Sequence, residues 1–312
     1  MIIVFRVLFS LYSQEVNKIT EKYKSKIHMY ADDIQIYLKC NDVDSKMNLV
    51  KDCFDDIQLW AQQNCLKLNQ SKSKLLVFSS KYSKFLTSSV NFNQYGFIIE
   101  SLVKNLGFTV DSFLDYNTQI NKVCRNGFYA LRNLWRISSK LSDVKLKIQI
   151  VNALVLSQID YCNSLYIYLP KKLINKLQRL MNAAVRFIFN LKKSDRVSVT
   201  SYMKICHFLP VKLRIDFKIA LFVYKCVNNL SPLYLQELIM PKNSLQSLRV
   251  FEDKLLLHVP AFHSQNYKNR TFSIVAPRIW NELPLSIRQS SSVNLFKTNL
   301  KTHYFETYYA DR

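Results

Sequence analysis

The side chains best suited to chemistry in this sequence are two adjacent carboxylates in the run Tyr30-Ala31-Asp32-Asp33. Like charges this close together raise the pKa of one partner, so the pair is stable when a cation neutralises it. Carboxylate oxygens suit Mg²⁺, and phosphoryl transfer by two metal ions uses carboxylates to clamp the attacking and leaving oxygens. The alternative is purely structural, because Asp-Asp is also favourable turn chemistry. The aromatic and small residues before the pair, with strands on both sides, favour metal binding.

Short strands and one long helix are expected to position this pair. Alternating apolar residues predict two strands within residues 26–39, joined at Ala31-Asp32-Asp33. Apolar positions that recur every three or four residues predict an amphipathic helix over 44–64. Further strands are predicted at 74–79, 103–110 and 255–259, and a last helix at 293–304.

Residues 116–230 are expected to be helical and strongly basic. Between residues 121 and 225 there are 20 Lys and Arg against 4 Asp and no Glu, so this segment carries +16 of the chain's net charge of +22. Apolar residues at helical spacing predict three helices in this region, one of them at 211–227. The other two follow from apolar stripes, one at Ile120, Val123, Phe128, Leu131 and Leu134, the other at Leu173, Leu177, Leu180, Ala184 and Ile188.

Basic residues recur at helical spacing beside these two stripes. A charged helix face is usually just solvated, but this segment lacks the opposite charges that salt bridges need. We therefore expect sequence-independent contacts with nucleic-acid phosphates. Tyr129 is a candidate for stacking on bases, whereas core packing is expected for Trp135. The expected contact residues are Lys122, Arg125, Arg132 and Arg136 on one helix, and Lys171, Lys172, Lys176 and Arg179 on the other.

Composition excludes several classes of site. With 3 glycines in the chain, a glycine-rich phosphate loop is excluded. The 7 cysteines are scattered, and no two of them form a C-x-x-C pair. This predicts reduced thiols in a protein of the cytoplasm or nucleus, and no zinc site. The apolar run at residues 1–12 is expected to be a helix packed in a core, not a signal sequence. No run is long enough to span a membrane, so we expect a protein that is not secreted and has no membrane partner.

Several runs together resemble the reverse transcriptases of non-LTR (LINE-type) retrotransposons, near the jockey and CR1 groups. Tyr30-Ala31-Asp32-Asp33 matches the polymerase palm signature Y/F-x-D-D. Similar runs lie in family order along nearly the whole chain. They are residues 7–12 (VLFSLY), 65–74 (CLKLNQSKSK), 103–107 (VKNLG), 157–165 (SQIDYCNSL), 209–215 (LPVKLRI) and 276–284 (APRIWNELP).

This resemblance implies an α+β fold. Residues 1–115 would form an incomplete polymerase palm, 116–230 a basic helical thumb-like region, and 231–312 a mixed C-terminal extension. It also implies an RNA-directed DNA polymerase, a nucleotidyltransferase that uses Mg²⁺ and deoxynucleotides to extend a DNA primer on an RNA template. Asp32 would ligate the catalytic metal with Asp33 as a secondary contributor, Tyr30 would pack near the primer terminus, and Lys72 would contact nucleic acid.

The sequence also departs from this family. The third carboxylate of the metal site belongs to an upstream palm strand, and only 29 residues precede Tyr30. Gln14-Glu15 stands where the family usually has Asn-Asp. We therefore expect weak Mg²⁺ binding and a truncated, inactive copy of the enzyme. Two alternatives stay open: a non-catalytic nucleic-acid-binding remnant, and a decayed gene fragment with no stable product.

The purified chain is expected to make no DNA in a primer-extension assay with an RNA template and Mg²⁺. The reason is that two carboxylates on one turn cannot form a two-metal clamp without ligands from a second strand. An intact reverse transcriptase serves as the positive control, and extension of the primer by this chain would contradict the expectation.

Overall fold

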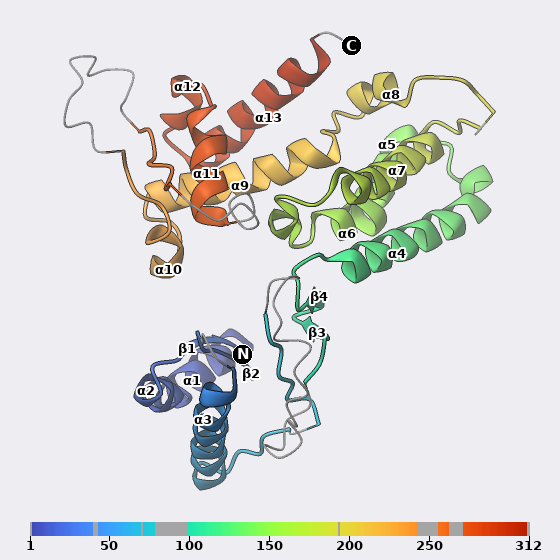
Figure 1. Cartoon of the computed structure of the whole chain (residues 1–312). Coiled ribbons are helices and arrows are strands. Elements are labelled where there is room, and N and C mark those ends of the chain that lie inside the picture. The colour runs from blue at the N-terminus through green and yellow to red at the C-terminus, as the bar shows by residue number, and fades with distance from the viewer. Residues whose placement is uncertain are drawn as a thin grey trace, which may run out of the picture. The chain divides into compact units, whose positions relative to one another are not determined.

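The computed structural model describes residues 2–39, 43–69, 71–78, 99–192, 194–242, 255–261 and 271–310. The chain forms two compact units, Met1–Asn105 with Val110–Leu114, and Leu106–Thr109 with Asp115–Arg312 (Figure 1). Helices dominate, and the described strands form two sheets of two strands each. The expected α+β class is confirmed at this level.

The first unit combines helices with a β-hairpin. The hairpin predicted within residues 26–39 and the helix predicted over 44–64 are both confirmed. The division between the two units falls within the β3–β4 hairpin. The elements are α1 (Ile2–Tyr12), α2 (Glu15–Lys22), β1 (Lys26–Tyr30), β2 (Asp33–Tyr37), α3 (Val43–Gln63), β3 (Leu102–Asn105) and β4 (Phe108–Asp111).

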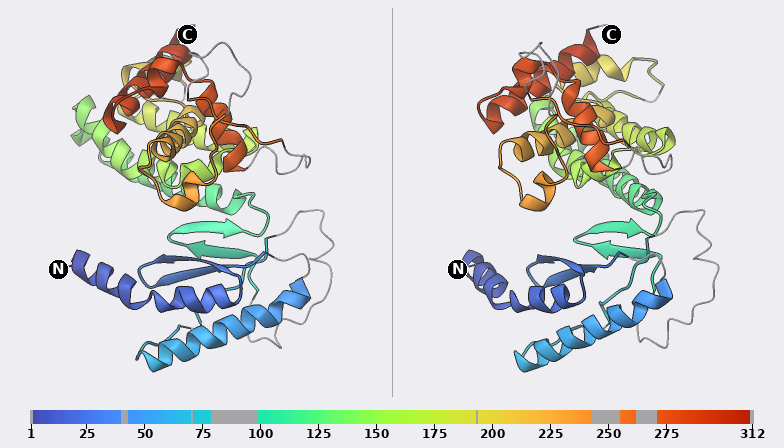
Figure 2. Two further views of the ribbon diagram at one scale, coloured as in Figure 1. Left: turned by 90° about the vertical axis from the view of Figure 1, so that its left-hand side faces the viewer. Right: turned by 60° about the vertical axis from the view of Figure 1, so that its left-hand side comes forward.

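The β1–β2 hairpin is held through one apolar face. Successive side chains of a strand point to opposite faces, so Ile27 and Ile34 lie on the face away from their polar neighbours and pack against a cluster from α2 and α3. Both helices lie on the same side of the hairpin (Figure 2). The buried members of this cluster are Val16, Cys53, Ile57, Trp60 and Ala61.

Helix α1 differs from its expected packing. The apolar run does form a helix, but Val7, Leu8 and Leu11 are exposed. The prediction that this helix packs in a core is therefore wrong for these side chains. The physical reason is that, among the side chains that the structure describes, the first buried member of the core cluster is Val16, on α2. The end of α1 is anchored by Tyr12, whose hydroxyl donates to the Asn64 carbonyl at 2.6 Å.

Three predicted strands have a different form in the structure. Residues 103–110 form two strands, because Gly107 adopts a positive φ of 87° that reverses the chain between β3 and β4. Residues 74–78 contribute only an isolated bridge, Leu75 to Ile99, and Ser79 lies outside the described residues. Residues 255–259 likewise contribute one bridge, Leu257 to Pro241.

The second unit is helical. The helices predicted from the two apolar stripes and at 211–227 are confirmed, and the last predicted helix extends to Tyr309. In the described parts of the chain, no helix is both long and apolar enough to cross a membrane. The helices are α4 (Asn117–Arg136), α5 (Val144–Val151), the π-helix η4 (Asn152–Leu156), α6 (Ser157–Asp160), α7 (Lys171–Ile188), α8 (Val199–Ile205), α9 (Val211–Val227), α10 (Leu233–Gln236), α11 (Phe272–Asn281), α12 (Leu285–Arg288) and α13 (Val293–Tyr309).

The centre of this unit is the contact between α4 and α7. All five predicted apolar positions of α7 are buried. On α4 the prediction is wrong at Phe128, which is exposed, and the buried position belongs to Gly127, which lies against Leu180. Gly127 continues the four-residue spacing from Val123 to Leu131, so it occupies the helix face that α7 covers.

Residues after α9 pack back onto that helix. Tyr224 of α9 stacks on Phe296 of α13, with ring centroids 4.3 Å apart, and Trp280 of α11 stacks on the same ring at 5.9 Å. The Tyr224 hydroxyl donates to the Ser290 carbonyl at 2.7 Å. The described residues of 231–310 thus share the second unit with residues 116–230.

Gly127→Ala is expected to lower the free energy of unfolding. A Cβ at this position would lie 2.5 Å from Leu180 Cδ2 and 2.9 Å from Cδ1, inside the buried core. Overpacking costs roughly 1–3 kcal/mol and the gain in helix propensity returns at most about 1 kcal/mol, so we expect a net loss of about 1 kcal/mol in urea denaturation. In a Leu180→Ala background the same substitution is expected to stabilise. Equal effects in both backgrounds would contradict the close contact.

Candidate nucleic-acid interface

The two carboxylates lie at the tip of the β1–β2 hairpin, as predicted. Tyr30 pairs with Asp33 at the end of the antiparallel register, and Ala31 and Asp32 form the turn. Ala31 has a φ of 53°, which a tight hairpin turn of this kind requires. Tyr30, Asp32 and Asp33 are all exposed. The tip therefore presents both carboxylates to solvent.

The hairpin face that carries Tyr30 and Asp33 is polar. The His28 ring lies edge-on to Tyr37, with centroids 5.4 Å apart. Gln35 accepts a hydrogen bond from the Tyr37 hydroxyl and donates to Asn105 Oδ1 at 2.8 Å. Burial raises the pKa of the Tyr37 hydroxyl, so it stays protonated at neutral pH and acts as a donor. These contacts fix the orientation of the face that leads to the acidic turn.

The described residues do not fit a two-metal site. Asp32 and Asp33 come from one turn of a sheet that has two strands. Within the described residues, no third Asp, Glu, His or Cys joins them in a group that could hold a metal ion. A clamp of two metal ions needs ligands on more than one segment. The pair alone supplies part of such a ligand set.

Lys72 lies in a separate turn of the first unit. Its backbone N–H donates to Asn69, at 3.1 Å to the carbonyl oxygen and 3.2 Å to Oδ1, and its side chain is exposed. The side chain is therefore accessible to solvent.

The basic residues of α4 lie on the side opposite its buried stripe. A helix turns by about 100° per residue, so Lys122, Arg125, Arg132 and Arg136 fall within one quarter of the helix circumference. Three are exposed and Lys122 is half-buried. Tyr129 projects between them and is 66% exposed. Trp135 lies edge-on to Phe187 with centroids 5.3 Å apart, but it is 42% exposed at the edge of the buried stripe, so the prediction of core packing is wrong for this residue.

Helices α4 and α7 run side by side in the same direction. Three contacts occur in the same order along both. Lys176 Nζ donates to Asn121 Oδ1 at 2.8 Å, Gly127 meets Leu180, and Trp135 meets Phe187. The two helices are therefore parallel, and their facing side chains meet in the same order from the first turns to the last.

This alignment places the two basic stripes on one surface. Lys176 belongs to the stripe of α7, and its partner Asn121 is one helical turn before Arg125 on α4. Lys171 is turned by about 100° from Lys172 and lies outside the stripe, contrary to the expectation that all four lysines and arginines of α7 share one face. We call the remaining seven residues the basic face: Lys122, Arg125, Arg132, Arg136, Lys172, Lys176 and Arg179.

Neither helix contains an Asp or Glu, so the basic face has no neutralising partner within its own elements. Arg186 continues the stripe of α7 and was not expected from the sequence. Its guanidinium donates to the Lys192 carbonyl at 2.8 Å. The spacing of seven residues from Arg179 to Arg186 was the available signal.

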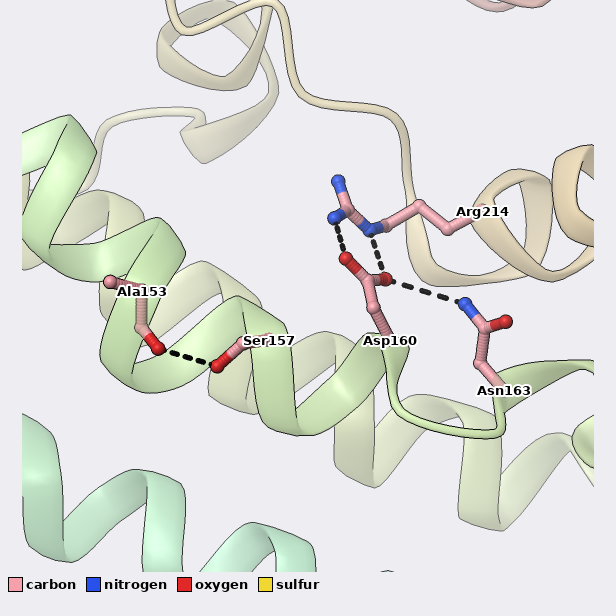
Figure 3. A network of polar contacts seen from close by, with 5 residues as sticks. All are labelled: Ala153, Ser157, Asp160, Asn163 and Arg214. Atoms are coloured by element: carbon pink, nitrogen blue, oxygen red, sulfur yellow. Dashed lines mark hydrogen bonds and ion pairs between the residues drawn. The ribbon is translucent and has the colours of Figure 1, made fainter. Parts of the chain in front are cut away.

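Two of the family-like runs meet in an ion pair. Asp160, at the end of α6, accepts two hydrogen bonds from the Arg214 guanidinium of α9, one of them from Nε at 2.8 Å (Figure 3). Asn163 Nδ2 also donates to Asp160 Oδ1, at 3.3 Å. The side chains of Asp160 and Arg214 are 32% and 20% exposed. Their role is to hold the turn after α6 against α9.

The cysteine of the same run is not a nucleophile candidate. Burial raises the pKa of the Cys162 thiol, which keeps it protonated and unreactive at neutral pH. All six cysteines in the described ranges are free, as expected, and Cys40 lies outside those ranges.

Comparisons with protein-family models, with curated proteins and with solved structures find no match. The likeness to polymerase motifs thus depends on the sequence runs themselves, and the chemistry of the interface depends on its charges and geometry.

Arg214→Lys is expected to lower the free energy of unfolding by about 1 kcal/mol, because Lys keeps the charge but cannot make two parallel hydrogen bonds to Asp160. Arg179→Lys, on the exposed side of α7, is the matched control and should change stability by less than about 0.5 kcal/mol. Urea denaturation of both variants measures the difference. Equal stability of the two would show that the bidentate pair contributes nothing.

Proposed function

We propose that this chain holds a nucleic-acid duplex on the basic face, as the palm-and-thumb part of a polymerase related to non-LTR retrotransposon reverse transcriptases. The observation that supports the proposal most strongly is the alignment of seven basic side chains from α4 and α7 on one surface without an acidic residue in either helix. Such a surface attracts a polyanion and repels other cations.

The ligand class follows from the arrangement of the charges. Lys122 to Arg136 span four turns of α4, and Lys172 to Arg179 run beside the first turns of that row. An extended row of positive charge matches a continuous row of phosphates better than a single small anion. Contacts to phosphates position a duplex without reading its sequence. The proposed partner is therefore a template–primer duplex of RNA and DNA, bound through its backbone.

The acidic turn supports the polymerase part of the proposal in a limited way. A hairpin tip that presents two carboxylates beside an aromatic residue is the local geometry that the palm signature implies. Magnesium and deoxynucleotides belong to the proposal only together with carboxylates from another segment, because the described residues supply one turn of ligands. On its own the chain is proposed to bind nucleic acid without extending it.

The decayed-fragment alternative has a separate readout. A chain with no stable product would show no cooperative unfolding transition. The second unit argues against this alternative, because many of its apolar side chains are fully buried, among them Leu177, Leu180, Ala184 and Ile219.

The double reversal Arg125→Glu/Arg132→Glu is expected to weaken binding of an RNA–DNA duplex at least tenfold. With seven phosphate contacts the slope of log K against log salt concentration would be about −6, and each lost contact reduces it by about 0.9. The control is Lys297→Glu/Lys301→Glu on α13, which makes the same change in net charge at two exposed positions of the same unit. Fluorescence anisotropy over a salt series measures both. Equal weakening by the two double variants would overturn the proposed face.

A further inference from the structure

A groove of about 370 Å³ opens on the second unit beside the basic face. This volume lies in the range of roughly 300–1,000 Å³ that small-ligand sites occupy. None of the described residues that line it is acidic. They come from the turn after β3, from α4 and from α6, and are Gly107, Gln119, Lys122, Val123, Asn126, Ser157, Gln158 and Tyr161.

The groove is lined by the aromatic ring of Tyr161 and by the side-chain amides of Gln119, Asn126 and Gln158. The Tyr161 side chain is 48% exposed, and its hydroxyl donates to the Leu106 carbonyl, which fixes the ring beside Gly107. A Cβ at Gly107 would lie 3.8 Å from the Tyr161 hydroxyl oxygen, so the glycine leaves the edge of the ring open. Aromatic rings held in this way are the usual stacking surface for unpaired bases.

The amides provide both donors and acceptors. Gln119 is buried and uses its Oε1 to accept from the Thr109 N–H at 3.0 Å, so it forms a fixed polar floor of the groove. Gln158 donates to the Leu154 carbonyl at 2.6 Å, which leaves its Oε1 as an acceptor. Asn126 makes no side-chain hydrogen bond to another described residue. Asn and Gln side chains pair with the edges of bases through this combination of groups.

The wall that carries Ser157 and Gln158 follows the π-helix η4. Ser157 Oγ donates to the Ala153 carbonyl at 2.5 Å, within η4 (Figure 3). Gln158 Nε2 likewise donates to the Leu154 carbonyl, so both side chains are tied back to η4. Single-turn π-helices occur often at functional sites. Here the π-helix sets the rotation of the residues that face the groove.

Lys122 connects the groove to the basic face, because it belongs to both. We infer that the groove holds one unpaired base of a single-stranded segment that continues from the bound duplex. The base stacks on Tyr161, pairs along its edge with the amides of Asn126 and Gln158, and has its phosphate next to Lys122. This inference rests on the proposed function, since the basic face delivers the strand to the groove.

The test compares a blunt RNA–DNA duplex with the same duplex carrying a short single-stranded overhang, by fluorescence anisotropy. Tyr161→Leu is expected to weaken binding of the overhang duplex roughly tenfold, because it removes the stacking surface, and to leave the blunt duplex unchanged. Tyr161→Phe keeps the ring but loses the hydroxyl bond to the Leu106 carbonyl, so it should weaken binding of the overhang duplex much less than Tyr161→Leu does and leave the blunt duplex unchanged. Asn126→Ala, at an exposed helical position that folding does not depend on, should weaken overhang binding about fivefold. Gln149→Ala, an exposed amide on α5 outside the groove, is the control.

Each outcome separates the inference from the proposed function. If Tyr161→Leu and Asn126→Ala bind the overhang duplex as tightly as the original chain does, the groove is not the base site, although binding through the basic face stands. If both substrates weaken equally, Tyr161 supports the fold and the inference is also wrong. If the unaltered chain binds neither substrate, the proposed function fails and the inference with it. Should Tyr161→Leu fail to fold, a photoreactive base in the overhang decides, and absence of a cross-link to Tyr161 in the unaltered chain overturns the inference.

Discussion

The close approach of α4 to α7 at Gly127 and Leu180 is the contact on which the interface depends. Without a Cβ at position 127 the helices can approach with Leu180 fully inserted. Because the helices run in the same direction, this one contact also sets the register of every residue outside the core. Lys122 and Arg125 are brought beside Lys176, and Arg132 and Arg136 continue the same surface. A packing constraint in the core therefore determines where positive charge collects outside it.

This arrangement carries an electrostatic cost. Basic side chains gathered on one surface repel one another, and neither helix offers a carboxylate to offset them. The apolar side of α7, which is buried along its whole length, supplies the compensating stability. Elsewhere in the same unit charges are paired, as in the Asp160–Arg214 pair and the Lys212–Asp216 pair. Charges at the structural contacts are thus neutralised within the protein. The charges of the basic face have no carboxylate in either helix, and they remain able to attract a polyanion.

Sequence reasoning recovered the features that depend on local periodicity. The hairpin with Asp32 and Asp33 at its tip follows from strand alternation and turn chemistry, and α7 and α9 follow from their apolar spacing. The sequence-based predictions were wrong where packing against another element, or a single turn residue, determines which side chains are buried and where a strand ends. Phe128 is as apolar as its neighbours, but α7 covers the face of Gly127. Val103 to Val110 contains enough apolar residues for one strand, but Gly107 reverses the chain. The groove could not be expected, because it joins a turn, α4 and α6, which are far apart in the sequence.

Nucleic-acid binding by the basic face is tested most directly by a lysine-acetylation footprint of the intact chain, read by mass spectrometry with and without a saturating RNA–DNA duplex. The duplex is expected to protect Lys122, Lys172 and Lys176 from acetylation, while the exposed Lys297 and Lys301 of α13 react at the same rate in both states. Protection of the α13 lysines instead, or uniform protection across the chain, would contradict the assignment of nucleic-acid binding to the α4–α7 surface.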